Sequence, residues 1–195
     1  MVAVIDFRST APVTRGDLTG LNPYLSQLIS EPFLFARESY GGELTLHFGR
    51  EIELKPFRGL RLTEGTHILC LRASVWAVKS VPWGASVSSE DADVRPGGGL
   101  VSLRELEARP LVTPGERIIR IDARAFHGVG WPGGIELGLW FSDNSFLEVR
   151  PRYDPDDPVH DLADWELFTP YNRYIKAGPG VQWEYSPSDR AAPAG

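Results

Sequence analysis

Polar and apolar residues alternate along much of the chain, and this pattern predicts β-strands. In the segment 43–48, Leu44, Leu46 and Phe48 occupy every second position and therefore share one face. Alternation of this kind is typical of a strand with one buried face. Further segments that alternate, or that are rich in β-branched and aliphatic residues, lie at 67–71, 74–78, 118–121, 136–141, 146–149, 165–168, 174–176 and 181–185. We therefore expect antiparallel sheets in a mainly β fold.

Two short segments carry helix signals instead. In the first, Asn22 is a suitable N-cap, Pro23 suits the first helical position, and an apolar stripe follows. In the second, over 102–107, Ser102 and Glu105 have the spacing of a capping box. We expect one or two short helices packed on the sheets, which makes the class a β-rich α+β fold.

One short sequence pattern occurs twice in the chain. The pattern Leu-x-Leu-x-Phe at 44–48 recurs at 137–141, and both copies follow a Gly-Gly pair and a glutamate. Downstream of each copy, Trp76 and Trp165 stand shortly before aliphatic residues. This order indicates two similar half-units. Coincidence is the alternative, because alternation by itself fixes half of the positions in any two amphipathic strands.

The expected organisation is one compact domain over 1–195. Its halves would span about 24–80 and 116–185, joined by a flexible loop over 81–99 that is rich in Gly, Ser and Pro. Four turn-forming residues inside 136–149 predict a hairpin there.

Composition and charge narrow the classes of protein. Of the 195 residues 42% are apolar and 11% aromatic, which is enough for a packed core. No apolar run reaches the ~18–20 residues that a transmembrane helix needs, and the first residues lack a secretory pattern, so we expect a cytoplasmic protein and no membrane contact. Cys70 is the single cysteine; it forms no internal disulfide, and its apolar neighbours predict a buried thiol. The net charge of −6 disfavours nucleic-acid binding and is compatible with a basic protein partner.

No residue pattern typical of catalysis or metal binding stands out. The four histidines are widely spaced, whereas a structural zinc site needs four nitrogen or sulfur ligands. The acidic segment 154–161 lacks the glycine and terminal glutamate of an EF-hand. There is no Gly-x-Ser-x-Gly motif, although a triad or carboxylate pair assembled from distant residues stays open. We therefore assign no catalytic residue, no metal and no cofactor.

Aromatic side chains outside the predicted core are the most informative group. Trp140 is expected on the outer face of its strand, where the helix, the other half or a partner must cover it. Trp83 and Trp131 neighbour Pro and Gly and so lie on loops, either as plugs against the core or as binding anchors. The candidate partner-binding residues are these three tryptophans and the carboxylates of the acidic segment, Asp154, Asp156, Asp157 and Asp161.

The chain also resembles a group of small bacterial proteins. The segments 40–49, 65–76 and 164–170 combine a Leu-x-Leu-x-Phe strand with later strands that contain Trp76 and Trp165. In this they resemble uncharacterised bacterial β-rich proteins that include domains similar to the immunity proteins of toxin systems. The resemblance implies a β-rich fold and carries over no catalytic residue.

These observations favour a non-catalytic protein-interaction module. An immunity, regulatory or accessory subunit of a bacterial defence or conflict system would bind another protein, or a second copy of itself, through such aromatic surfaces and strand edges. Two alternatives stay open. One is a β-module that binds carbohydrate or another small ligand, and the other is a hydrolase that uses distributed carboxylates and His160.

Overall fold

The computed structural model describes residues 13–15, 18–38, 43–54, 56, 62–72, 74–80, 85–88, 112–127, 133–152, 163–170 and 172–187. Within these ranges the chain forms twelve strands in two sheets, and every strand pairing is antiparallel. The predicted mainly β class with antiparallel sheets is therefore confirmed.

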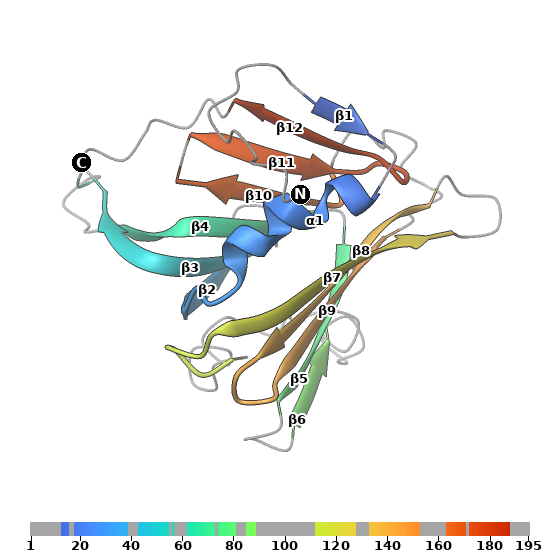
Figure 1. The fold of residues 1–195 in the computed structure, drawn as a ribbon. Coiled ribbons are helices and arrows are strands. Elements are labelled where there is room, and N and C mark those ends of the chain that lie inside the picture. The colour runs from blue at the N-terminus through green and yellow to red at the C-terminus, as the bar shows by residue number, and fades with distance from the viewer. Residues whose placement is uncertain are drawn as a thin grey trace, which may run out of the picture.

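The strands divide into a seven-stranded and a five-stranded sheet (Figure 1). In spatial order the seven-stranded sheet consists of β1 (Val13–Arg15), β12 (Trp183–Pro187), β11 (Arg173–Ala177), β10 (Trp165–Thr169), β4 (Thr63–Leu71), β3 (Leu44–Glu53) and β2 (Phe33–Glu38). The five-stranded sheet consists of β6 (Ala85–Ser88), β5 (Ser74–Ser80), β9 (Phe146–Pro151), β8 (Gly134–Phe141) and β7 (Ile118–Phe126).

The alternating segments behave as their patterns predict. On β3 and β8 the two Leu-x-Leu-x-Phe patterns are buried and belong to one continuous core cluster that includes side chains of both sheets. The predicted hairpin over 136–149 is formed by β8 and β9. Its turn is closed by the Ser145 N–H, which donates to Asp143 Oδ1 at 2.8 Å, and Asn144 takes the positive φ that this tight turn requires.

The helical segment is shorter than the apolar stripe suggests. It consists of a 3₁₀ turn η1 (Leu18–Gly20), the helix α1 (Asn22–Leu25) and a second 3₁₀ turn η2 (Ser26–Leu28). Asn22 is not the N-cap as predicted: Leu21 stands there without a side-chain cap, and Pro23 lies in the first turn. The segment is stabilised by burial of three leucines in the core, Leu21, Leu25 and Leu28.

Two other expectations differ from the structure. The predicted loop over 81–99 contains the strand β6, because Ala85–Ser88 pairs with β5 although its small residues have little strand preference of their own. The strands β1 and β2 were not predicted, and the apolar start of β2 does not alternate clearly. The second predicted helix, over 102–107, lies outside the described residues.

The two proposed halves follow the same order of strands. In each, three consecutive strands form a meander in one sheet (β2–β3–β4 and β7–β8–β9), and the chain then crosses to the other sheet. The registers also correspond: Leu44, Leu71 and Trp165 lie opposite one another across β3, β4 and β10, as Leu137, Val149 and Trp76 do across β8, β9 and β5. A common origin of the halves stays a prediction.

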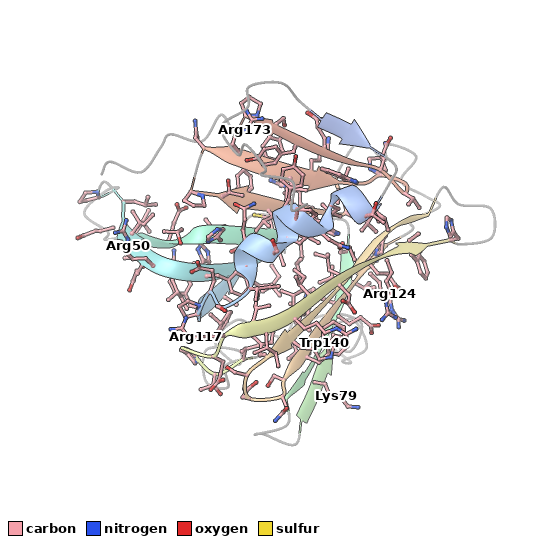
Figure 2. All side chains as sticks on the ribbon, viewed as in Figure 1. Arg50, Lys79, Arg117, Arg124, Trp140 and Arg173 are labelled. Carbon is pink, nitrogen blue, oxygen red and sulfur yellow. The ribbon has the colours of Figure 1, made fainter. Side chains whose placement is uncertain are left out.

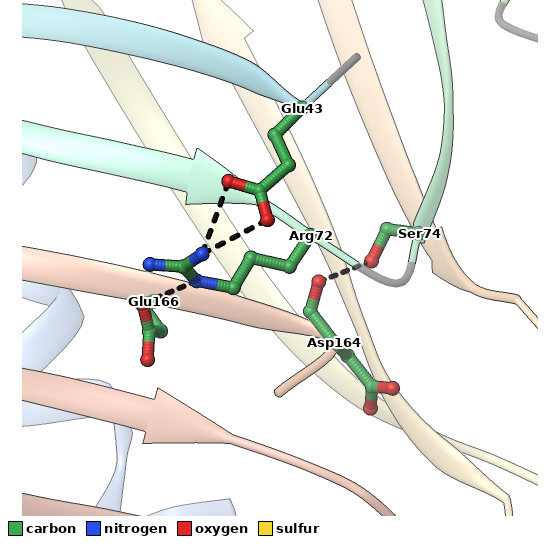
Figure 3. Close-up of polar contacts among 5 residues, drawn as sticks. All are labelled: Glu43, Arg72, Ser74, Asp164 and Glu166. Carbon is green, nitrogen blue, oxygen red and sulfur yellow. Dashed lines mark hydrogen bonds and ion pairs between the residues drawn. The ribbon is translucent and has the colours of Figure 1, made fainter. Parts of the chain in front are cut away.

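The two sheets are joined by a polar clasp on the backbone of Ile135, at the start of β8. The Asp164 carboxyl accepts a hydrogen bond from the Ile135 N–H, and the Trp165 indole N–H donates to the Ile135 carbonyl at 2.9 Å. On the other side, the Ser74 hydroxyl donates to the Asp164 carbonyl at 2.6 Å (Figure 3). Asp164 and Trp165 are both buried, so these bonds are shielded from water.

Glycine makes room for the Asp164 carboxyl group. A Cβ atom on Gly178, which has a φ of +78°, would lie 2.3 Å from Asp164 Oδ2, and one on Gly134 would lie 2.6 Å from the same atom. That oxygen is buried without a hydrogen-bond partner. Burial therefore raises the pKa of Asp164 to about 7, although the Ile135 N–H opposes the shift.

The first prediction concerns this carboxyl group. Since the pKa of Asp164 is about 7 in the folded chain and 3.8 ordinarily, the folded state keeps a proton that the unfolded state releases. The free energy of unfolding should thus fall as the pH rises from about 4 to about 7, by on the order of 4 kcal/mol. Asp164→Asn removes this titration and keeps an oxygen for the Ile135 N–H, so the variant should gain stability relative to the wild type over the same range.

Urea unfolding of both proteins at several pH values measures the effect. His67 titrates in an overlapping range, because burial lowers its pKa to about 4, and its contribution cancels in the difference between the two proteins. A difference that stays constant with pH would show that Asp164 is ionised normally in the folded state.

The second prediction concerns the other arm of the clasp. Trp165→Phe removes the indole donor and leaves the buried Ile135 carbonyl and a small cavity, which should cost about 2–4 kcal/mol of unfolding free energy. Trp76→Phe is the matched control, because Trp76 holds the position on β5 that corresponds to Trp165 on β10. Trp76 is only half-buried, so this variant should lose less unfolding free energy. Equal losses in the two variants, measured by chemical unfolding, would contradict a special role for the clasp.

Candidate functional site

One of the predicted site residues, Trp140, lies in the described part of the chain. The other six fall on residues that the structure does not describe: Trp83, Trp131, Asp154, Asp156, Asp157 and Asp161. The candidate site is therefore built around Trp140.

Trp140 is on the outer face of the five-stranded sheet, as predicted. On β8, Leu139 and Phe141 are buried in the core, and the residue between them must point to the opposite face. Figure 2 shows Trp140 and Arg124 on this sheet. We name this surface the Trp140 face; it comprises Arg120, Asp122, Arg124, Glu136, Gly138, Trp140, Phe146, Glu148 and Arg150.

Neighbouring strands cover both sides of the Trp140 ring. Arg120 lies opposite Trp140 on β7, with its guanidinium carbon 4.4 Å from the centre of the ring. Phe146 lies opposite on β9, with the ring centres 4.6 Å apart. Trp140 was expected to be covered by the helix, the other half or a partner. Part of this cover comes instead from side chains on the same face of the sheet, and the indole contacts a cation and a second ring.

A shallow hollow opens beside the indole. Gly138 is one of its lining residues, and the rings lie so close over it that a Cβ atom there would lie 2.8 Å from Trp140 Cη2 and 3.1 Å from Phe146 Cε2. The hollow has a volume of about 60 Å³. Pockets for small organic ligands usually have about 300–1,000 Å³. This hollow therefore suits the end of one side chain better than a whole small molecule.

Ion pairs surround the hollow. Asp122 pairs with Arg120 and, at 3.6 Å, with Arg124. Hydrogen bonding from Arg120 is the largest influence on Asp122 and lowers the pKa of its carboxyl group. Arg150 lies 3.3 Å from Glu136 and 2.9 Å from Glu148.

The charges of the Trp140 face balance, with three arginines against three carboxylates. The face thus does not itself select a basic partner. The acidic segment that suggested one, 154–161, lies outside the described residues.

A second charged cluster lies at the end of β4, on the seven-stranded sheet. Arg72 Nε donates to Glu166 at 2.6 Å, and its Nη1 donates to both oxygens of Glu43 at 2.9 and 3.0 Å (Figure 3). One guanidinium thus engages both carboxylates. The cluster joins three strands and leaves neither glutamate positioned as a general acid.

The buried histidines have structural partners. His47 Nδ1 accepts a hydrogen bond from the Gly65 N–H at 3.1 Å, and Phe35 packs on its ring at 4.4 Å. Burial lowers the pKa of His67 to about 4, so its ring is neutral at physiological pH. In the described ranges no group of three or more His, Cys, Asp or Glu is placed to hold a metal ion.

Sequence reasoning found Trp140 but not the residues that hold it. Arg120, Asp122 and Arg124 stand at every second position of β7, and this charged alternation marks an outward face. The strand was predicted only over 118–121, from its aliphatic residues, so the charged alternation that continues to Arg124 was not used. Gly138 gave no such signal, because its role depends on the ring of Trp140 lying above it.

A prediction follows for Cys70. The thiol is buried in β4, and burial raises its pKa to about 12. The folded protein should therefore resist alkylation by iodoacetamide at pH 8, whereas the urea-unfolded chain should react at the rate of a free thiol. Mass spectrometry of timed samples measures both rates, and rapid labelling of the folded chain would contradict the assignment.

Comparisons with known proteins identify no relative of this chain, so a functional assignment must be based on the fold and the Trp140 face. The chain matches no protein-family model, no curated protein sequence and no solved structure. Among the described residues no helix is long and apolar enough to cross a membrane.

Proposed function

We propose that this chain is a non-catalytic protein-interaction module and that the Trp140 face is its contact surface. The observation that carries the proposal is the ordered stack of Arg120, Trp140 and Phe146 beside the Gly138 hollow. Tryptophan and arginine are the residues most enriched among the dominant contacts of protein interfaces, where they fill or border small pockets.

The surroundings of the stack fit the same function. Because Trp140 is held on both sides, little side-chain entropy is lost when a partner covers its exposed edge. The ion pairs of Asp122 and Arg150 lie around the hollow, as polar residues do around the centre of an interface. A partner side chain that enters the hollow would contact aromatic carbon first and charged groups at the rim.

Carbohydrate binding is less well supported by this geometry. A sugar ring stacks on an open aromatic face, and both faces of Trp140 are occupied by Arg120 and Phe146. For a hydrolase, the carboxylates described above are either bound to arginine or, at Asp164, enclosed by the backbone. An immunity, regulatory or accessory role in a bacterial defence system remains a proposal that rests on the sequence resemblance.

The fourth prediction tests the Trp140 face. A partner obtained by cross-linking and affinity capture with the wild-type chain is purified, and its affinity is measured by isothermal calorimetry. Trp140→Ala should weaken binding by about tenfold to a hundredfold, the usual loss at a dominant interface contact. Gly138→Ala should also weaken it, because the new Cβ displaces the indole and fills the hollow.

Phe168→Ala is the matched control. Phe168 is a half-exposed aromatic residue that stacks with Tyr174 at 5.5 Å, but on the seven-stranded sheet. It should leave the affinity unchanged, and circular dichroism should show that all three variants remain folded. Full affinity in both Trp140→Ala and Gly138→Ala would reject this surface. A wild-type chain that forms no complex and no dimer in native mass spectrometry, yet binds a glycan array, would favour the carbohydrate alternative.

A further inference from the structure

A buried arginine on the seven-stranded sheet has an unfilled binding edge. Arg173 is the first residue of β11 and shares the inner face of the sheet with Ile175 and Ala177, which are both buried. Its exposed fraction is 4%. Figure 2 shows it on the upper sheet, far from Trp140.

Aromatic and hydroxyl groups surround this side chain. The guanidinium carbon lies 4.7 Å from the centre of the Tyr185 ring, and Tyr185 in turn packs against Tyr24 of α1 at 4.5 Å. The Thr169 hydroxyl donates to the Arg173 carbonyl at 3.1 Å. We name Tyr24, Thr169, Arg173 and Tyr185 the Arg173 cluster. Tyr185 stacks on the guanidinium and its side chain also hydrogen-bonds with Arg173, which together fix the plane of the group and leave the remaining in-plane N–H groups to bind elsewhere.

Two of the guanidinium nitrogens, Nε and Nη2, are buried and have no hydrogen-bond partner among the residues that the structure describes. The hydrogens of these two atoms point to the same side of the group. Together they form the edge that binds two oxygen atoms of a carboxylate or phosphate in parallel.

Arg72 shows how the same chain satisfies such a group. Its Nε is bonded to Glu166 and its Nη1 to Glu43, so two carboxylates balance its charge. No such pairing is formed by Arg173 within the described part of the chain. Tyr185 does not supply the missing charge, because burial raises the pKa of its hydroxyl and keeps it neutral. Buried charges are normally paired, and an unpaired one is destabilising.

We propose that Arg173 is a binding site for an oxyanion, a carboxylate or phosphate group of a ligand, which the Nε and Nη2 edge engages with two parallel hydrogen bonds. The Tyr185 ring is the platform that holds the guanidinium, and the Thr169 hydroxyl holds the backbone of Arg173 through its carbonyl. This site lies on a different sheet from the Trp140 face and does not depend on its function.

The fifth prediction tests this site with inorganic phosphate and with acetate, each titrated into the whole 195-residue chain at constant ionic strength. Calorimetry should show saturable binding of at least one of the two, with one site per chain, and the better ligand identifies the preferred oxyanion. Arg173→Met should weaken this binding by at least about tenfold, because two charge-assisted hydrogen bonds are lost. Arg173→Lys, which keeps the charge but lacks the two-nitrogen edge, should bind with intermediate affinity.

Arg124→Met is the matched control, since it removes an exposed arginine from the five-stranded sheet. Its affinity should equal that of the wild type. Without ligand, Arg173→Met should have a melting temperature at or above that of the wild type, because an unpaired buried charge has been replaced by an apolar chain. No saturable binding of either anion, or binding that persists in both Arg173 variants, would overturn the proposal. Trp140→Ala should bind the anion normally, which separates this test from that of the proposed function.

Discussion

The arrangement of both sheets depends on the clasp that Asp164 and Trp165 form on the backbone of Ile135. Trp165 is the first residue of β10 in the seven-stranded sheet and Asp164 directly precedes it, while Ile135 is the second residue of β8 in the five-stranded sheet. Apolar packing between sheets is not directional and lets one sheet slide over the other. Hydrogen bonds are directional, so the bonds from Asp164 and Trp165 to the N–H and carbonyl of Ile135 fix one alignment of the two sheets. Because the side-chain period of a strand is two, the same alignment decides which residues of β8 point outward. The orientation of Trp140, five residues beyond the clasp, therefore depends on it.

The corresponding registers of the two halves place stacked rings at equivalent positions of the outer faces. His47 on β3 lies opposite Phe35 on β2, and Trp140 on β8 lies opposite Arg120 on β7. The outcomes differ: the His47 ring is buried and bonded to the Gly65 N–H, whereas Trp140 stays partly exposed beside the space that Gly138 leaves. One position is thus enclosed within its sheet, and its equivalent remains partly exposed. This difference arises from the neighbouring side chains, because the backbone pairing is the same in both halves.

The strands and the inner faces were predictable from the sequence because their signal is local. Leu137, Leu139 and Phe141 alternate with polar residues, and alternation of this kind is visible in a single segment. β6 was missed because Ala85–Ser88 becomes a strand through its partner β5 and not through its own residues. The environment of Trp140 was missed for a similar reason, since Arg120 and Phe146 reach it only across two strand pairings. The clasp depends on contacts about 30 residues apart in the chain, and no local pattern indicates that Asp164 and Trp165 should meet Ile135.

Three buried or half-buried ionisable groups show how this fold deals with charge in its interior. Arg72 is balanced by Glu43 and Glu166, at the cost of holding three side chains from three strands in place. Asp164 lacks a cationic partner, but a carboxyl group can become neutral by keeping its proton, and its raised pKa reflects this. Arginine has no such option, because a guanidinium remains protonated in proteins under all ordinary conditions. An arginine that is buried and has no carboxylate partner among the described residues, as Arg173 is, therefore carries an unbalanced charge until an anion pairs with it. For this reason the same burial that makes Asp164 a pH-dependent structural element makes Arg173 a binding site.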